Sequence, residues 1–247
     1  MLWGYVAMAD QDPFCDPETG VCTPADLGQT AKAKVEKDPN REIIYVGDPM
    51  CSWCYGISKH LLTLRDHYPQ YHFKIVVGGL RPGGGEAWDD RMKDMLKHHW
   101  EEVNKRSGQP FGYKLFDRES FNYDTEPSCR AVVAARPYLG ERELEFFEAV
   151  ARHFYLDNED PTELAFYKPL CEQFQIPFDE FAKAFQSEEV RYETQQEFML
   201  NRQWGVRGYP TVVFSTGKEL FQINPGYAEF EQMKEVIEKI TAEEAEA

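Results

Sequence analysis

Two cysteines separated by two residues, Cys51 and Cys54, are the side chains of this chain best suited to chemistry. They follow a short apolar run, Ile43–Val46, and precede a segment whose apolar residues recur every three or four positions, so a strand ends and a helix begins at the pair. Unpaired N–H groups and the dipole at a helix N-terminus stabilise a thiolate on the first cysteine, and the second lies one turn further on. The spacing predicts thiol–disulfide exchange, with Cys51 as the exposed nucleophile and Cys54 as the resolving thiol.

Two other interpretations of this pair stay open. A zinc site would need two further ligands of matching spacing, and the chain has no second Cys-x-x-Cys. His98 and His99 do not supply them, because adjacent residues on a helix point about 100° apart. The pair could also be two ordinary buried thiols, although its position between a strand and a helix favours chemistry. We therefore expect no metal.

Charge and composition narrow the partners. The chain has 247 residues, with 27 Lys and Arg against 43 Asp and Glu, and a formal net charge of −16. Nucleic acids and anionic membranes require clustered basic side chains, so we expect neither as a partner. No apolar run approaches the ~20 residues that span a bilayer. The segment Met1–Ala9 lacks the basic region and the ~15–30-residue length of a signal peptide. We expect a cytoplasmic protein, with Met8 as an alternative start and an oxidising compartment still open.

The segments around the cysteines predict an α/β fold. Ile43–Val46 and His72–Val77 are typical of buried strands, and the residues between them predict a helix from near Cys51 to His67. If the two strands are parallel, the first delivers Cys51 to the carboxyl edge of the sheet, where open α/β sheets bind their ligands. Two more strands and a final helix are expected near the C-terminus, at Thr211–Phe214, Glu219–Ile223 and Ala228–Ile240.

Between these two halves, almost every segment from Glu86 to Gln203 favours a helix. Helix breaks are expected at Gly108–Pro110, Pro137–Gly140, Asp157–Pro161 and Ile176–Pro177, with Thr162 as an N-cap and Gly205 as a helix stop. The predicted organisation is an N-terminal extension (1–40), a core domain (41–85 and 205–241), an inserted helical subdomain (86–204) and an acidic tail (242–247).

A second element is Gly208-Tyr209-Pro210-Thr211, which stands immediately before a β-branched strand. Together with the cysteine pair it resembles the thioredoxin superfamily, and the helical block inserted between the second and third strands resembles the DsbA-like branch. Over about 42–240, the chain is similar to the bacterial predicted protein-disulfide isomerases of the DsbA family. The matching strings are Tyr45–Gly56, Gly79–Gly83, Tyr123–Ala131 and Gly205–Thr211.

This resemblance implies a thioredoxin fold and a set of roles. Cys51 would attack a substrate disulfide, Cys54 would resolve the mixed disulfide, and Pro210 would be cis. The backbone of Tyr209 would pair with an extended substrate chain by strand addition. Protein or small-molecule thiols and disulfides are the implied substrates, and no metal, nucleotide or flavin is implied. Glutathione is one candidate redox partner, without a sequence signature of its own.

Three more side chains are candidates for contact with substrate. Trp53 is expected to be exposed by its place between the cysteines. Asp124 and Thr125 stand at a polar helix start that could face the sheet edge, and capping with a surface ion pair is the alternative interpretation. All three side chains can contact a substrate only if the fold places them near the cysteine pair.

The chain also departs from its relatives. Ser52-Trp53 contains no histidine to stabilise the Cys51 thiolate, so an extreme oxidant is not expected. Thioredoxins usually place a buried carboxylate six residues before the nucleophile to handle the proton of the second cysteine, whereas that position here is Tyr45. Asp48 or a water molecule is the expected substitute.

Four cysteines lie outside the motif. Cys15 and Cys22 flank a Pro- and Gly-containing turn that could bring their sulfurs together, which allows a loop-closing disulfide, a second redox pair that exchanges with Cys51, or unpaired thiols. Cys129 and Cys171 stand among apolar residues, so we expect both to be buried thiols.

Two rival functions use the same fold. Glutathione transferases of the kappa type and hydroxychromene-carboxylate isomerases usually lack the paired cysteine, so Cys54 is evidence against them. A chaperone-like peptide binder would hold unfolded chains beside Tyr209 and would need neither active-site cysteine. The two rivals are therefore separable from disulfide exchange by replacing the cysteines.

Overall fold

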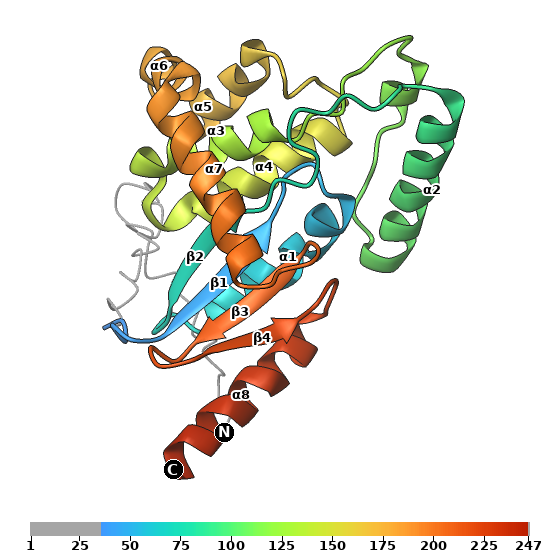
Figure 1. Ribbon diagram of the computed structural model, residues 1–247. Helices are drawn as coiled ribbons and strands as arrows, with labels where there is room; N and C mark the ends of the chain where they lie inside the picture. Colours follow the sequence, from blue (N-terminus) through green and yellow to red (C-terminus); the bar gives the residue numbers. More distant parts are fainter. Residues whose placement is uncertain (1–35, 247) are drawn as a thin grey trace, which may run out of the picture. The chain divides into compact units, whose positions relative to one another are not determined.

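A four-stranded β-sheet carries the fold in this computed structural model, which describes residues 36–246 (Figure 1). The strands lie in the order β2-β1-β3-β4, and their bounds are β1 (Glu42–Gly47), β2 (His72–Val77), β3 (Thr211–Ser215) and β4 (Leu220–Asn224). Strands β1 and β2 are parallel, whereas β3 runs antiparallel to both β1 and β4. The predicted parallel pair and the predicted C-terminal hairpin are both confirmed.

Helix α1 (Ser52–His67) links β1 to β2, as the spacing of its apolar residues predicts. Ile57, Leu61 and Leu64 recur on one side of the helix and are fully buried. The helix α8 (Phe230–Glu246) closes the chain and buries Met233 and Ile237. It begins two residues later and runs further than the predicted 228–240.

The segment between β2 and β3 is the predicted helical insertion, visible in Figure 1 beside and above the sheet. Its α-helices are α2 (Asp90–Ser107), α3 (Glu126–Leu139), α4 (Glu143–Tyr155), α5 (Lys168–Phe174), α6 (Phe178–Gln186) and α7 (Glu188–Gln203). Short 3-10 turns are formed by Lys114–Asp117, Gly140–Arg142 and Leu164–Tyr167. The α/β fold with a large helical insertion is thus confirmed.

The insertion differs from the sequence prediction in three places. The break expected at 108–110 extends to Thr125 and contains only one 3-10 turn. Pro137 lies inside α3, where it removes a single backbone donor two residues before the helix ends. Thr162 caps no helix, because its hydroxyl and its N–H both donate to the Asp160 carboxylate at 2.7 and 3.0 Å.

Strand β1 is buried on both faces, which explains its uninterrupted apolar sequence. Ile43 and Tyr45 belong to the large core that α1 and the insertion share, whereas Ile44 and Val46 form a small cluster with Val76 on the opposite face. Both faces of this strand are therefore held by packing, which fixes the position of its carboxyl end. Among the helices of residues 36–246, none has both the length and the apolar character needed to cross a bilayer.

A charged network ties the insertion to the edge of the sheet. Arg136 of α3 donates to Glu143 of α4 at 2.7 Å, to Glu197 of α7 and to the Ile75 carbonyl of β2 at 3.3 Å. Glu197 also accepts the backbone N–H of Val77 at 2.8 Å. Burial alone would lower the pKa of Arg136, but its two carboxylate partners outweigh burial and raise it.

Arg136→Gln should destabilise the protein because it leaves two largely buried carboxylates without their cation. Fully buried pairs lose about 3–5 kcal/mol when one partner is removed, and the partial exposure of Arg136 reduces this to roughly 2–3 kcal/mol. Urea denaturation measures the free energy of unfolding. Arg191→Gln, whose partner Glu188 is 96% exposed, is the matched control and should cost below about 1 kcal/mol. Equal losses in the two variants would contradict this role of Arg136.

Candidate active site

Cys51 and Cys54 lie at the junction between β1 and α1. Cys51 is the N-cap residue of α1 and has an extended backbone, and its carbonyl accepts the N–H of Tyr55 at 3.1 Å. Its own N–H donates to the Asp48 carbonyl at 2.9 Å, which closes the turn after β1. The expected placement of the first cysteine at a helix N-terminus is therefore what the structure has, and both thiols are free.

The two sulfurs are less accessible than the motif suggests. The expectation of an exposed Cys51 is wrong, because this residue is only 6% exposed, while Cys54 is completely buried. The loop that carries Tyr209 causes this burial: the Cys51 thiol donates to the Tyr209 carbonyl at 3.6 Å. Of the two cysteines, Cys51 is still the one with any exposed surface.

Tyr209 and Pro210 bring the C-terminal half of the chain to the cysteines. The peptide bond between them is cis. The Tyr209 hydroxyl donates to the Gly78 carbonyl at 2.6 Å and to the Asn201 side chain at 3.3 Å. Gly78 has no alternative here, since a Cβ at this position would lie 2.6 Å from the Tyr209 ring. The Asn201 amide in turn donates to the Val77 and Gly78 carbonyls, both at 3.1 Å.

Asp48 joins the cysteine loop to the loop after β2. Its carboxylate is fully buried and accepts the backbone N–H of Met50 at 2.8 Å and that of Leu80 at 2.7 Å. Its own N–H donates to the Cys54 sulfur at 3.5 Å. Burial raises the pKa of Asp48, and its hydrogen bonds offset only part of that rise.

The environment of Cys54 favours its protonated thiol form. Burial raises the pKa of Cys54 well above its ordinary value, and the neighbouring Cys51 raises it further. The Tyr45 side chain acts in the opposite direction and lowers the pKa of Cys54. A buried, protonated second sulfur suits the expected division between a nucleophile and a resolving thiol.

Tyr123 supports the cysteine loop from the insertion and was not singled out in the sequence. Its hydroxyl donates to the Met50 carbonyl at 2.9 Å and lies 3.5 Å from the Tyr155 hydroxyl. Burial raises the pKa of Tyr123 beyond the range in which it ionises. One signal in the sequence could have identified Tyr123. It is the first residue of the matching string Tyr123–Ala131 and immediately precedes Asp124 and Thr125.

Trp53 is half-buried rather than exposed, which corrects the expectation for this residue. Its ring packs against Tyr227 in the loop between β4 and α8, with ring centroids 5.7 Å apart. The Arg106 guanidinium lies 5.5 Å from the Tyr227 ring centroid on another side. Trp53 and Tyr227 thus form an aromatic pair next to the cysteines, from segments far apart in the sequence.

Asp124 and Thr125 both hold the loop that follows β2. The Thr125 side chain is fully buried, and its hydroxyl accepts the N–H of Arg81 at 2.9 Å. The Asp124 carboxylate accepts the N–H of Gly83 at 2.7 Å and that of Glu126 at 3.0 Å. A helix cap whose side chain also binds a distant loop cannot be distinguished from a substrate contact in the sequence alone.

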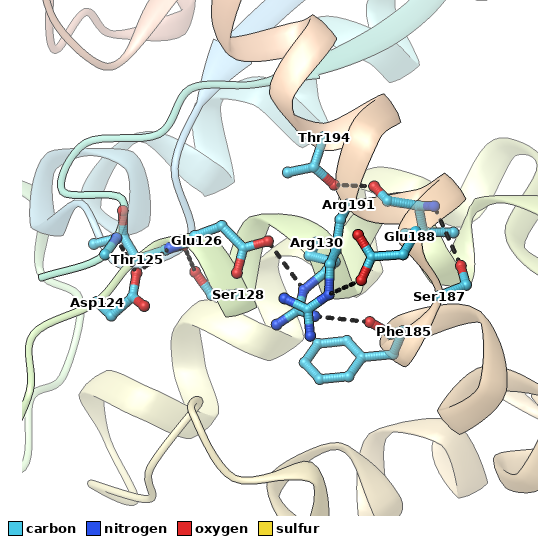
Figure 2. Close-up of polar contacts among 12 residues, drawn as sticks. Asp124, Thr125, Glu126, Ser128, Arg130, Phe185, Ser187, Glu188, Arg191 and Thr194 are labelled. Carbon is cyan, nitrogen blue, oxygen red and sulfur yellow. Dashed lines mark hydrogen bonds and ion pairs between the residues drawn. The ribbon is translucent and has the colours of Figure 1, made fainter.

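Figure 2 shows that polar contacts continue from these residues along α3 to α6 and α7. Arg130 pairs with Glu126 at 3.0 Å, donates to the Phe185 carbonyl at 2.9 Å and lies 4.2 Å from the centroid of the Phe185 ring. Burial lowers the pKa of Arg130. This network joins helices of the insertion and lies on the side of α3 that packs against them.

Within residues 36–246, Cys129 and Cys171 are free thiols that form no disulfide with Cys51 or Cys54. Cys129 and Cys171 are fully buried, as predicted, and burial raises the pKa of Cys171 to about 11. The interpretations of Cys15 and Cys22 concern residues outside the described part of the chain. In that described part, no group of three His, Cys, Asp or Glu side chains is arranged to hold a metal ion.

A cavity of about 440 Å³ opens on the same loop as Tyr209. It is lined by Gly205, Arg207, Gly208, Thr211, Gln222 and Pro225. Gly208 and Thr211 flank the Tyr209–Pro210 bond, and the Thr211 hydroxyl donates to the Gly208 carbonyl at 2.9 Å. Arg207 is the single charged side chain of this lining.

Comparison with known proteins places the chain among redox proteins. A thioredoxin-like domain matches residues 145–241, which include β3 and β4. No curated protein matches the sequence. A proposed protein disulfide isomerase from Nitrosomonas europaea is 33% identical with a TM-score of 0.76, and the match covers 83% of this chain and 98% of that protein.

Two more distant structures share the fold. The cytosolic disulfide reductase DsbM from Pseudomonas aeruginosa is 22% identical with a TM-score of 0.65, over 81% of this chain and 98% of its own, and its structure is also known with glutathione. A 2-hydroxychromene-2-carboxylate isomerase is 13% identical with a TM-score of 0.58, over 83% of this chain and 98% of its own.

Asp48→Asn should lower the free energy of unfolding by roughly 1–3 kcal/mol. The asparagine amide has one acceptor oxygen, so one of the N–H groups of Met50 and Leu80 would face an NH₂ group and lose its partner. Urea denaturation at neutral pH provides the measurement, with Asp94→Asn on the exposed side of α2 as control.

The pH dependence has a definite sign. Because burial raises the pKa of Asp48 in the folded state, stability should fall as the pH rises through that pKa, and the asparagine variant should lack this loss. A variant as stable as the parent protein at neutral pH would contradict the bridging role of Asp48.

Proposed function

Because the chain belongs to the thioredoxin-like family of DsbA-type disulfide isomerases and oxidoreductases, and is a thiol–disulfide oxidoreductase, we propose that Cys51 and Cys54 are its redox-active pair. The observation that carries this proposal is the placement of the Cys51 sulfur, at the N-cap of α1 and 3.6 Å from the Tyr209 carbonyl, with Cys54 buried behind it. In this proposal the Cys51 sulfur reacts with the substrate, and the buried Cys54 sulfur resolves the mixed disulfide.

The exchange proceeds in two attacks. The Cys51 thiolate attacks one sulfur of a substrate disulfide, the substrate S–S bond breaks, and the other substrate sulfur leaves as a thiolate. The first substrate thiolate takes up the proton of Cys54, and the Cys54 thiolate then attacks the Cys51 sulfur, which breaks the mixed disulfide and releases the second substrate thiolate. The substrate is reduced by two electrons and the pair is oxidised to a disulfide, and the reverse sequence oxidises a substrate dithiol.

The substrate chain approaches along the loop that leads into β3. Tyr209 offers its backbone next to the Cys51 sulfur, and an extended peptide can pair with such a backbone by strand addition. Trp53 and Tyr227 supply apolar surface on the neighbouring segment. Protein disulfides with little local structure fit this arrangement best.

Glutathione is the proposed small-molecule partner. The DsbM reductase, which shares the fold, has been solved with glutathione. In this chain the cavity beside Tyr209 contains one cation, Arg207, which suits a carboxylate of a small thiol. A local cation matters here, since the chain carries a formal net charge of −16 and repels anions elsewhere. We place this exchange in the cytoplasm, in keeping with the sequence expectation.

The transferase and isomerase alternative rests on fold alone. The isomerase neighbour is 13% identical, a level at which only the fold is shared. In this chain Cys54 stands directly behind Cys51, with its sulfur bonded by the Asp48 N–H. A reaction that only binds glutathione would not use this second sulfur.

Cys51→Ser should abolish the reduction of a fluorescent disulfide peptide, because no sulfur remains at the surface. Cys54→Ser should retain the first attack and accumulate a mixed disulfide between Cys51 and the peptide, measured by mass spectrometry in non-reducing conditions. Cys171→Ser on α5 is the matched control and should turn over like the parent protein, since Cys171 lies outside the site.

The double variant Cys51→Ser/Cys54→Ser separates catalysis from peptide binding. It should lose all exchange activity. If this variant still suppresses the aggregation of an unfolded protein as well as the parent, and the single variants turn over normally, the protein is a peptide binder and the proposed function is wrong.

Arg207→Ala should raise the KM for glutathione about tenfold and leave kcat nearly unchanged. A charge-assisted hydrogen bond is worth about 1.5–3 kcal/mol, and 1.4 kcal/mol corresponds to a factor of ten. The effect should shrink with added salt, because screening weakens an exposed ion pair. Lys218→Ala, in the exposed turn between β3 and β4, is the control of equal charge. A KM for glutathione equal to that of the Lys218 variant would remove Arg207 from the site.

A further inference from the structure

The Tyr45 hydroxyl is a buried donor without a hydrogen-bond partner in the described residues. Tyr45 lies on β1 with no exposed surface, and no donor or acceptor in residues 36–246 pairs with its hydroxyl oxygen. An unpaired buried hydroxyl costs on the order of 1–3 kcal/mol, so such groups in folded proteins call for a reason. Phenylalanine would fill the same space without this cost.

The position of the hydroxyl suggests the reason. A side chain at Gly47 would collide with the Tyr45 hydroxyl, which therefore lies against the backbone at the end of β1. The next residue, Asp48, donates its N–H to the Cys54 sulfur at 3.5 Å. The free hydroxyl and the buried sulfur thus share one small space behind Cys51.

Of the described side chains near the Cys54 sulfur, Tyr45 has the hydrogen-bond donor that is not already in use. The Asp48 carboxylate, which could act on Cys54, is occupied as an acceptor by the N–H groups of Met50 and Leu80. Burial, followed by the nearby charge of an ionised Cys54, raises the pKa of Tyr45, so its proton stays on the oxygen. A phenol that keeps its proton is able to donate a hydrogen bond to a thiolate.

We propose that the Tyr45 hydroxyl donates a hydrogen bond to the Cys54 sulfur whenever that sulfur is a thiolate. This inference rests on the proposed function, and it names a residue that touches a reacting atom. In the resting dithiol, Cys54 keeps its proton and the hydroxyl stays unpaired. The missing bond forms when negative charge appears on the sulfur.

Negative charge reaches Cys54 in two steps of the exchange. When an incoming thiolate attacks Cys51 of the oxidised enzyme, the Cys51–Cys54 bond breaks and its electron pair moves to the Cys54 sulfur. When Cys54 later attacks the mixed disulfide, it does so as a thiolate. In both steps Tyr45 keeps its proton and shares it with the sulfur, so the hydrogen bond adds no atom or electron to the balance.

The Tyr45 ring is held in place for this task. It packs edge-on against Phe147 of α4, with ring centroids 5.3 Å apart, and both residues are fully buried. A donor fixed in advance stabilises a developing charge without a reorganisation of the site. Water has no comparable access to Cys54, because this residue has no exposed surface.

Tyr45→Phe tests the proposal, with Tyr68→Phe as matched control. The Tyr68 hydroxyl is also buried and without a partner in the described residues, but Tyr68 is the C-cap of α1, and its backbone lies roughly 26 Å from that of Cys51 at 1.5 Å per residue. Both variants remove one orphaned hydroxyl from the core. Only the first removes it beside the active-site sulfurs.

The expected effect falls on the steps that use Cys54. Loss of the donor should reduce the Cys54 thiolate population about tenfold, and the greater nucleophilicity of a more basic thiolate recovers about a factor of three. Resolution of a preformed mixed disulfide on Cys51 should therefore slow roughly threefold, measured by rapid quenching and mass spectrometry. Attack of glutathione on the oxidised enzyme should slow as well, because Cys54 is then a poorer leaving group.

Alkylation of Cys51 by iodoacetamide should proceed within twofold of the parent rate in both tyrosine variants. In a Cys54→Ser background, Tyr45→Phe should have no effect on the lifetime of the mixed disulfide, which is the coupling that a double-mutant cycle detects. Both variants should unfold at urea concentrations no lower than the parent protein.

Two results are decisive. Parent-like resolution in Tyr45→Phe, together with a trapped mixed disulfide in Cys54→Ser, would overturn the role of Tyr45 and leave the proposed function standing. Failure of Cys54→Ser to trap a mixed disulfide would overturn the proposed function itself.

Discussion

The structure at the carboxyl end of β1, next to the two cysteines, depends on the buried carboxylate of Asp48. A buried charge is costly unless hydrogen bonds satisfy it, and Asp48 obtains those bonds from the N–H groups of Met50 and Leu80. These donors belong to two different loops, one leading to Cys51 and one following β2. The loops cannot separate without leaving the carboxylate and two donors unpaired. The two sulfurs therefore lie at a junction whose two loops are joined by hydrogen bonds through Asp48.

The two cysteines at this junction differ in their exposure to solvent. Cys51 caps α1 and contacts the Tyr209 loop, where we propose that the substrate binds, whereas Cys54 has no exposed surface. Burial opposes a thiolate on Cys54 and keeps that sulfur in reserve. A resolving thiol must nevertheless become nucleophilic on demand. The unpaired hydroxyl of Tyr45 on the adjacent strand is suited to meet that demand.

Local patterns predicted the parts of the fold that local physics determines. Strands with continuous apolar residues, the helix after Cys51 and the C-terminal hairpin all lie where the sequence placed them. Contacts between distant segments were beyond its reach. Thr125 stands at a helix start as expected, and its hydroxyl also accepts a hydrogen bond from Arg81, 44 residues away, which no local pattern indicates. Trp53 is likewise half-covered by Tyr227, a residue with no signal of its own.

The helical insertion acts on the site and is more than a cover for the sheet. The hydroxyl of Tyr123, just before α3, donates to the Met50 carbonyl of the cysteine loop, and the amide of Asn201, near the end of α7, donates to the carbonyls of Val77 and Gly78. The same Gly78 carbonyl accepts the Tyr209 hydroxyl. A shift of α7 would therefore move the Tyr209 loop and with it the carbonyl that faces Cys51. Changes within the insertion can thus alter the access of substrates to Cys51 while both cysteines keep their places on α1.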